Sequence, residues 1–221
     1  MTKTEPIPVL YRDEDLVGVA KPPGLLVHRS SEAPDRDVLM TRVRDQEGRW
    51  VYPVHRVDRG TSGVVLFAWT SEGARDLHER LGRSTALKEY LVLCRGSTPQ
   101  RFESRRPLGG KPARTEFEKV AEFHRSSLLR ARLRSGRRHQ IRRHLAHLAH
   151  QVIGDRRYGK SRINAANRAL GLERIFLHAR RVAFEHPRSG ERIEIDCPLP
   201  EDLRRFLARV WPEGGARIAT L

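Results

Sequence analysis

Short apolar runs separated by turn residues recur along most of this 221-residue chain. The runs IPVLY and LVGVA, on either side of the acidic RDED, predict a β-hairpin near the start of the chain. Further strands are expected in WVYPV, VVLFAW and KEYLVLC, at about 114–123 and 127–133, and near 175–184 and 191–196.

Apolar positions at helical spacing predict four helices among these strands. DVLMTRVRDQEG predicts a short helix with Val38 and Val43 inward that ends at Gly48. TSEGARDLHERLGR predicts a second helix, with Thr70 or Ser71 as its cap, and two more are expected in RRHQIRRHLAHLAH and EDLRRFLARVW. Because strands dominate without a βαβ rhythm, we expect an α+β protein with a mixed, mainly antiparallel sheet and flanking helices, and not a Rossmann fold.

The composition is that of a folded protein with a high content of charge. Hydrophobic residues make up 38% of the chain and charged residues 32%, yet no long low-complexity tract interrupts the apolar runs. The two cysteines, Cys94 and Cys197, belong to no CxxC pair, so we expect both to be reduced and packed in strands. The N-terminal residues contain no apolar signal region, and no stretch reaches the length of a membrane span, which predicts a cytoplasmic protein without a membrane partner.

The excess of positive charge is concentrated in one segment. The chain carries a formal charge of +16, and residues 101–150 hold 14 Lys/Arg against 4 Asp/Glu. Such a basic segment indicates a polyanionic partner, and the dominance of arginine favours phosphate contacts. Nucleic acid is the leading candidate; acidic lipid is less favoured, since no amphipathic anchor is visible.

An acid stands out in this basic context. In HRVDRGTSG, residues 55–63, Asp58 lies between Arg56 and Arg59 just before a Gly-Thr-Ser-Gly turn. Taken alone, an aspartate in a loop is usually a cap or turn residue. If the arginines are close in space they favour the ionised carboxylate, which can act as a nucleophile or electrostatic stabiliser but not as a general acid.

Five blocks of this chain, in order, resemble motifs of the RluA-type pseudouridine synthases. The blocks are LVGVAKPPGLLVH, HRVDRGTSGVVLFA, LKEYLVLCRG, SGRRHQIRRHLAHLAHQVIGDRRYG and FLHARRVAFEHPRSGERIEI. The similarity extends from about residue 8 to 203. It implies a pseudouridine synthase catalytic core with a central RNA-binding cleft, a single domain over 1–221 without a separate S4 module, no cofactor and no metal.

The resemblance also assigns roles at the reacting centre. Asp58 would be the catalytic aspartate of a reaction that breaks the N1–C1′ bond of a uridine and joins C1′ to C5. Arg142 would pair with Asp58, and Tyr90 would lie against the target base. Lys88 would help to line the cleft, and Ile141 is a candidate for the apolar pocket floor, although core packing is an equally good interpretation of Ile141.

Other basic residues would act on the RNA. Arg56 would enter the stack in place of the flipped uridine, which must leave the helix before C1′ can be reached. His55 would brace the loop. The remaining expected RNA contacts are Arg59, Arg137, Arg138 and Arg143.

Two features of the chain left other interpretations open. Histidines 139, 144, 147 and 150 could suggest zinc, but no carboxylate or thiolate nearby completes a tetrahedral set, so we expect no metal there. The stretches VHRS, IRRHLAHL and RINAANRALGLERIFLHA are most similar to the tRNA pseudouridine synthase C branch, which implies uridine at position 65 in the T stem of tRNA as target. Ribosomal RNA is the alternative substrate.

Two further classes of function compete with the synthase. A non-catalytic RNA-binding or assembly factor could use the same scaffold, and an RNA N-glycosidase or nuclease is a weaker option. The presence of Asp58, Tyr90 and Arg142 together favours the enzyme, because binding alone does not require an anion in the cleft. We expect it to act as a monomer, with neither a nucleotide cofactor nor a membrane partner.

Overall fold

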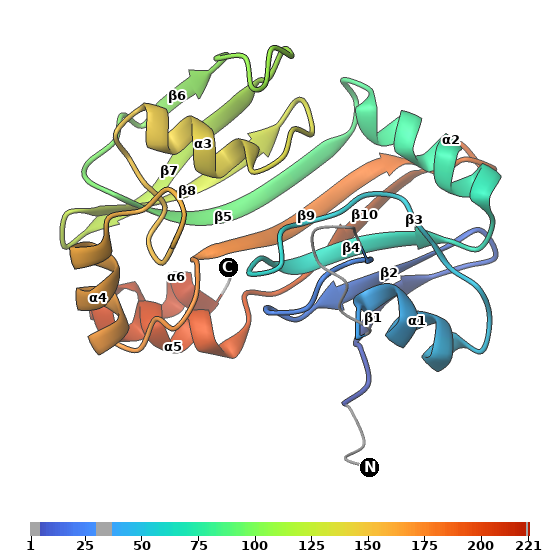
Figure 1. The fold of residues 1–221 in the computed structure, drawn as a ribbon, viewed down its shortest axis with the longest axis horizontal. Helices are drawn as coiled ribbons and strands as arrows, with labels where there is room; N and C mark the ends of the chain where they lie inside the picture. The colour runs from blue at the N-terminus through green and yellow to red at the C-terminus, as the bar shows by residue number, and fades with distance from the viewer. Residues whose placement is uncertain (1–4, 30–36, 220) are drawn as a thin grey trace. The chain divides into compact units, whose positions relative to one another are not determined.

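The computed structural model describes residues 5–29, 37–219 and 221. The chain divides into two compact units, Met1–Leu87 with Arg181–Cys197, and Lys88–Arg180 with Pro198–Leu221. Strand β9 (Leu177–Glu185) belongs to the second unit up to Arg180 and to the first from Arg181 (Figure 1).

The strands of the first unit follow the order β1-β2-β4-β9, with β3 paired to β4 and β10 to β9. The pairs β1–β2, β2–β4, β3–β4 and β9–β10 are antiparallel. All seven residues of β4 are buried, which explains its continuous apolar run. Val64 and Leu66 belong to one apolar cluster and Val65 and Phe67 to another, because alternate side chains of a strand point to opposite faces of the sheet. The elements are β1 (Val9–Arg12), β2 (Leu16–Lys21), α1 (Leu39–Glu47), β3 (Tyr52–Pro53), β4 (Ser62–Ala68), α2 (Ser71–Gly82) and β10 (Arg192–Asp196).

The second unit continues from β9 in the order β9-β5-β8-β7-β6. Its core lies between β5, β8 and the C-terminal helices, where Leu91, Leu128, Phe176 and Leu207 are almost completely buried. Helix α3 lies beside β7 (Figure 1). The elements are β5 (Leu87–Arg95), β6 (Arg101–Ser104), β7 (Thr115–Phe123), β8 (Ser126–Leu133), α3 (Gln140–His147), α4 (Ser161–Ala169), α5 (Glu201–Val210), a 3₁₀ turn (Pro212–Gly214) and α6 (Gly215–Ala219).

The expected α+β class is confirmed, as are the N-terminal hairpin and the four expected helices. Thr70 is the cap of α2, where its hydroxyl accepts the N–H of Gly73, and Gly48 ends α1 in the left-handed conformation. Cys94 and Cys197 are buried and unbridged. Cys94 lies in β5, whereas Cys197 follows the last residue of β10.

The structure differs from the expected elements at α3, β3, β6 and α4. Helix α3 begins at Gln140, three residues later than expected, because His139 has a left-handed φ of 54° that a helix cannot continue through. Strand β3 contains only two residues. The sequence pattern also missed β6, a short strand at the end of the strand order, and α4, which has no buried residue and therefore no apolar stripe.

Within the described ranges, no helix is both long enough and apolar enough to cross a membrane.

Candidate active site

Asp58 lies in the loop between β3 and β4 of the first unit, and its side chain is half-buried. The carbonyl oxygen of Asp58 accepts the N–H of Thr61 at 3.0 Å, which closes the Gly-Thr turn behind the carboxylate. The Thr61 side chain is buried, so this residue is part of the turn and is not exposed to a substrate. The carboxylate is therefore presented from a loop whose backbone is hydrogen-bonded on itself.

Lys21, the last residue of β2, is hydrogen-bonded to the same loop. It is 1% exposed, and its Nζ donates to the carbonyl oxygens of Pro22 at 2.7 Å, Leu25 at 2.7 Å and Arg59 at 3.1 Å. The carbonyl of Arg59 also accepts the N–H of Gly24 at 2.8 Å. A buried ammonium group needs such acceptors, and here they connect the KPPG turn to the residue that follows Asp58.

His55 and Arg56 occupy the start of the loop. His55 is half-buried, and its Nε2 lies 3.3 Å from the backbone nitrogen of Leu66 in β4, an arrangement that braces the loop. Arg56 is exposed, as expected for a side chain that must reach RNA. Burial, together with the positive charge of Arg56, lowers the pKa of His28, so neutral His28 faces this arginine.

Arg142, on α3 of the second unit, is held by a partner that sequence reasoning did not assign. Its Nε donates to Oδ2 of Asp155 at 2.7 Å and its Nη2 to Oδ1 at 2.8 Å, a bidentate ion pair. The Asp155 side chain is fully buried, and that of Arg142 is 12% exposed. Burial alone would raise the pKa of Asp155, but the hydrogen bonds and charge of Arg142, with two backbone N–H groups, hold it below its usual value.

The loop that carries Asp155 has a closely packed backbone that does not accommodate a Cβ at its two glycines. Oδ1 of Asp155 also accepts the backbone N–H groups of Arg157 at 2.9 Å and Tyr158 at 3.1 Å. A Cβ on Gly154 would lie 2.1 Å from the carbonyl oxygen of Arg174, and one on Gly159 would lie 2.2 Å from that of Asp155. Only glycine fits at these two positions, so the GDRRYG motif specifies the backbone that positions Asp155.

Helix α4 supports this loop from the other side. The Asn164 side chain accepts the N–H of Gly154 at 2.9 Å and donates to the carbonyl of Asp155 at 2.8 Å. The Tyr158 ring lies beside the Arg142 guanidinium, 5.1 Å from ring centre to Cζ, and its hydroxyl is 3.0 Å from Nδ1 of His139. The guanidinium of Arg142 is thus held by Asp155 and Tyr158 of the GDRRYG loop, and α4 in turn supports that loop.

Buried polar groups also fix the first turn of α3. Gln140 is 3% exposed; its Oε1 accepts from Ser135 and Arg137, and its Nε2 donates to Arg114 and Thr115. Every hydrogen-bonding atom of this amide therefore has a partner, and the helix that carries Arg142 begins at a defined place.

Tyr90 and Lys88 lie in β5 of the second unit. Tyr90 is 9% exposed and is paired with Ala131 of β8, so it has the rigid, buried ring that stacking on a base requires. Burial lowers the pKa of Lys88, which is half-buried at the start of the strand. Ile141 is 4% exposed. Asp58 belongs to the first unit and Arg142 to the second, and their direct pairing stays a prediction.

The remaining expected RNA contacts differ in exposure. Arg59, Arg137 and Arg138 are exposed, whereas Arg143 is half-buried on α3. Arg137 Nε donates to the carbonyl of Pro112 at 3.1 Å, which limits how far this side chain can move.

Two histidines of the second unit, His144 and His150, are hydrogen-bonded to neighbouring protein groups. His144 is completely buried between the Thr115 hydroxyl at 2.9 Å and the Arg106 carbonyl at 3.0 Å, and burial lowers its pKa. His150 Nδ1 lies 2.9 Å from the Arg95 carbonyl. Neither ring nitrogen of His144 is left for a metal.

One acidic cluster in the first unit has the composition of a cation site. Asp13, Asp15 and His186 offer ligand atoms within 4.8 Å of one another. Nδ1 of His186 accepts the N–H groups of Arg188 and Ser189, so Nε2 carries the proton and donates to Asp13 at 3.1 Å. This proton makes the cluster a hydrogen-bonded contact between two turns.

Known proteins match this sequence and fold over most of their length. The family model described as RNA pseudouridylate synthase matches residues 15–147. A tRNA pseudouridine synthase C from Haemophilus ducreyi is 35% identical over 221 residues, which cover 87% of this chain and 91% of that protein. A ribosomal large subunit pseudouridine synthase C from Yersinia pestis is also 35% identical, with 90% of this chain and 68% of the relative covered.

A solved structure agrees with the sequence matches. Human RNA Pseudouridylate Synthase Domain Containing 4 superposes with a TM-score of 0.74 at 23% identity, and the match covers 91% of this chain and 92% of that chain. The expected fold is confirmed by this likeness. With a family model that spans more than half of the chain and two relatives at 35% identity, the chain belongs to the RNA pseudouridylate synthase family.

Proposed function

We propose that this protein isomerises specific uridines in structured RNA to pseudouridine, with tRNA as the substrate. The observation that carries the proposal is the loop of Asp58, in which a half-buried carboxylate is presented by a backbone held by Thr61 and, through Arg59, by buried Lys21. Because the chain belongs to the RNA pseudouridylate synthase family, we assign this carboxylate to the isomerisation of uridine. The similar tRNA enzyme of Haemophilus ducreyi favours tRNA, and the similar Yersinia pestis enzyme makes ribosomal RNA the second candidate.

The chemistry assigns a separate task to each residue. Asp58 acts while the N1–C1′ bond of the flipped uridine breaks; the detached uracil turns in the site, C1′ bonds to C5, and the C5 proton is released. Tyr90 provides a rigid ring for the base to stack on. Arg142, held by Asp155, supplies a fixed positive charge that would pair with Asp58 and orient it.

The substrate must deform before this chemistry can start. A paired uridine is unreachable in its stack, so the enzyme acts on an extruded nucleotide. Exposed Arg56 is placed in the same loop as Asp58, and its planar guanidinium can stack where the uridine has left. We propose that residues 1–221 act as one catalytic domain, and that the two buried free thiols suit the reducing cytoplasm.

Tritium release tests the proposal directly. Pure protein is incubated with tRNA and rRNA transcripts that carry tritium at uridine C5, without metal or nucleotide. Release of tritium from intact RNA is expected, and tRNA is expected to react faster than rRNA. An enzyme that released no tritium from any transcript of a broad panel would not be a pseudouridine synthase.

A substitution at Asp58 tests whether its carboxylate is required for turnover. Asp58→Asn is expected to abolish tritium release and to keep RNA affinity within about threefold, since the substitution removes charge and not volume. Asp202→Asn, at an ion pair on α5 with Arg174, is the matched control and is expected to keep full activity. Unchanged turnover in Asp58→Asn would remove this residue from the mechanism.

A further inference from the structure

The second unit contains a groove that no step of the proposed reaction uses. The groove encloses about 1080 Å³ and lies against α4, so we call it the α4 groove. Its volume lies slightly above the usual range for ligand pockets, about 300–1,000 Å³. The lining residues are Leu93, Arg95, Gly96, Ser97, Glu122, Phe123, His124, Arg125, Ser126, Ala149, His150, Ile153, Ile163, Ala166, Asn167, Leu170, Phe206, Arg209 and Val210.

The floor of the α4 groove is apolar. Phe123 and Phe206 belong to the buried core of the second unit, and the Phe123 ring stacks on Trp211 with centroids 5.3 Å apart. Leu170 also lines the groove and is 42% exposed, so it adds accessible apolar surface. A flat hydrophobic group would therefore be desolvated on this floor.

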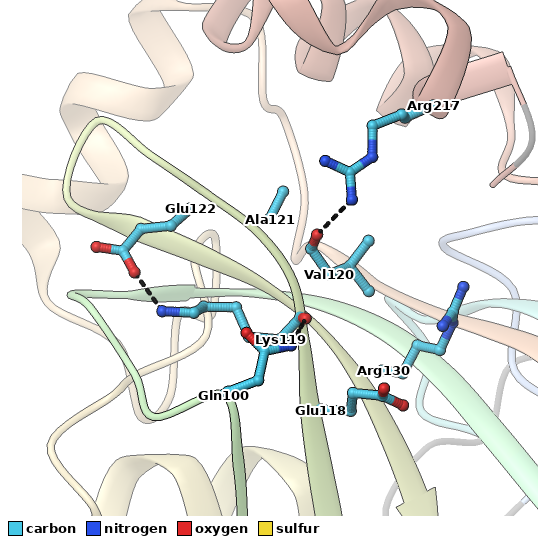
Figure 2. Close-up of a pocket in the computed structure, with 8 residues that line it drawn as sticks. All are labelled: Gln100, Glu118, Lys119, Val120, Ala121, Glu122, Arg130 and Arg217. Atoms are coloured by element: carbon cyan, nitrogen blue, oxygen red, sulfur yellow. Dashed lines mark hydrogen bonds and ion pairs between the residues drawn. The ribbon is translucent and has the colours of Figure 1, made fainter.

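The groove has more positive than negative side chains along its lining. Arg95, Arg125 and Arg209 line the groove, and Glu122 is its one carboxylate among the lining residues. Figure 2, which shows a neighbouring polar pocket, shows Glu122 turned to Lys119, whose Nζ lies 2.6 Å away. Neither Arg95 nor Arg125 has a side-chain hydrogen bond or ion pair within the described part of the chain, so both guanidinium groups are available to an anion.

The turn that carries Arg125 holds two non-glycine residues in the left-handed region. His124 and Arg125 join β7 to β8 as a two-residue turn, with Phe123 paired to Ser126. Their φ values are 46° and 58°, in the left-handed region where Asn-Gly is the usual pair. Both side chains are exposed at the groove, and such strain is characteristic of binding sites.

We propose that the α4 groove binds one nucleotide of the substrate RNA outside the reacting uridine, with the base on the apolar floor and adjoining phosphates on Arg95 and Arg125. An apolar floor inside a cationic rim fits a base flanked by phosphates. The ligand class rests on the proposed function, since RNA is the polyanion on which this family acts. Helix α4 contributes both to the groove and to the support of Arg142. Asn167 lines the groove, and Asn164 is hydrogen-bonded to the loop of Asp155, the partner of Arg142.

Affinity measurements with charge-matched variants test the groove. Binding of a labelled tRNA transcript is measured by anisotropy over a series of salt concentrations, for the full chain and the double variant Arg95→Gln/Arg125→Gln. We expect roughly tenfold weaker binding or more, and a salt slope smaller by about 2, one for each lost phosphate contact. The matched control is Arg204→Gln/Arg205→Gln, which removes two exposed arginines of α5 outside the groove.

Crosslinking locates the contact independently. Irradiation of the wild-type complex with a transcript containing 5-iodouridine is expected to attach RNA to residues 122–126 or 163–170. Equal losses of affinity in both double variants, or unchanged affinity without a crosslink in these segments, would overturn the proposal. An unchanged RNA affinity combined with binding of an acidic peptide would also overturn it, because the groove would then serve a protein.

Tritium release keeps the two proposals apart. If the wild-type protein modifies RNA while the groove variant binds as tightly as the wild type, only the groove is refuted. If the wild type binds RNA through the groove and releases no tritium, only the proposed reaction is refuted.

Discussion

Replacing Asp155 with asparagine tests the ion pair that positions Arg142. Asparagine has nearly the same volume, so the change removes the negative charge and one acceptor from a side chain that is fully buried. Losing one charge-assisted hydrogen bond costs about 1.5–3 kcal/mol, and leaving a partner unpaired in a buried pair costs up to about 5 kcal/mol. Because Arg142 is 12% exposed and asparagine keeps one oxygen, we expect a loss of about 2–4 kcal/mol in the free energy of unfolding.

Two measurements follow from this estimate. Thermal denaturation should show a midpoint lower by roughly 5–15 °C for a chain of this size. Single-turnover tritium release should fall about 100-fold at a temperature where the variant is folded, since a displacement near 1 Å costs about that factor. RNA affinity should stay within about threefold. Asp202→Asn is the control: its pair with Arg174 has a similarly short contact of 2.6 Å, but Asp202 is 45% exposed.

The pH dependence gives the same test a second readout. Although burial opposes it, Arg142 holds the pKa of Asp155 below its usual value, so the pair stabilises the fold fully above about pH 4. This contribution is lost as the pH falls through the folded-state pKa, and Asp155→Asn should lack that part of the acid destabilisation. A folded Asp155→Asn enzyme that turns over within twofold of the wild type would refute the positioning role, as would additive effects of Asp155→Asn and Arg142→Ala.

The other predictions concern the glycine, lysine and cysteine positions. Gly154→Ala should lower the free energy of unfolding, measured by denaturant titration, by more than about 3 kcal/mol. The reason is that φ at Gly154 is +81° and the new Cβ would meet the Arg174 carbonyl. The control Gly215→Ala, which has open space around the new Cβ, should change this free energy little. Lys21→Met should cost about 2 kcal/mol, one for each of the Pro22 and Leu25 carbonyls that loses its donor, and should slow tritium release; wild-type stability would contradict this. Burial raises the pKa of Cys94 to about 12, so a thiol reagent at pH 8 should label it only after unfolding.

The sequence predicted those elements whose burial leaves a periodic signal. Strand β4 is apolar without interruption because both of its faces are covered, and α2 has Leu77 and Leu81 on one buried face. Helix α4 could not be predicted in this way, because it has no fully buried side chain: Ile163 is only partly buried against the core, and Asn164 makes polar contacts. Tertiary hydrogen bonds of this kind leave no period in the sequence.

Of the candidate site too, only a part could be predicted from the sequence. The motifs identified Asp58, Tyr90 and Arg142, and the charge pattern predicted the exposed arginines. They did not give Asp155 or Lys21 a role, although both stand in the quoted GDRRYG and KPPG motifs. Which acid pairs with which base depends on how distant segments meet, and a single sequence does not specify this.

The buried ammonium group of Lys21 has a consequence for how the reaction is timed. Its three protons are donated to three backbone carbonyls, one of them next to Asp58, so the loop already has its working conformation before RNA arrives. The conformational cost of reaching C1′ then falls on the nucleic acid, which must open its own stack. The same enzyme should therefore modify a bulged or mispaired uridine faster than a uridine in a stable pair.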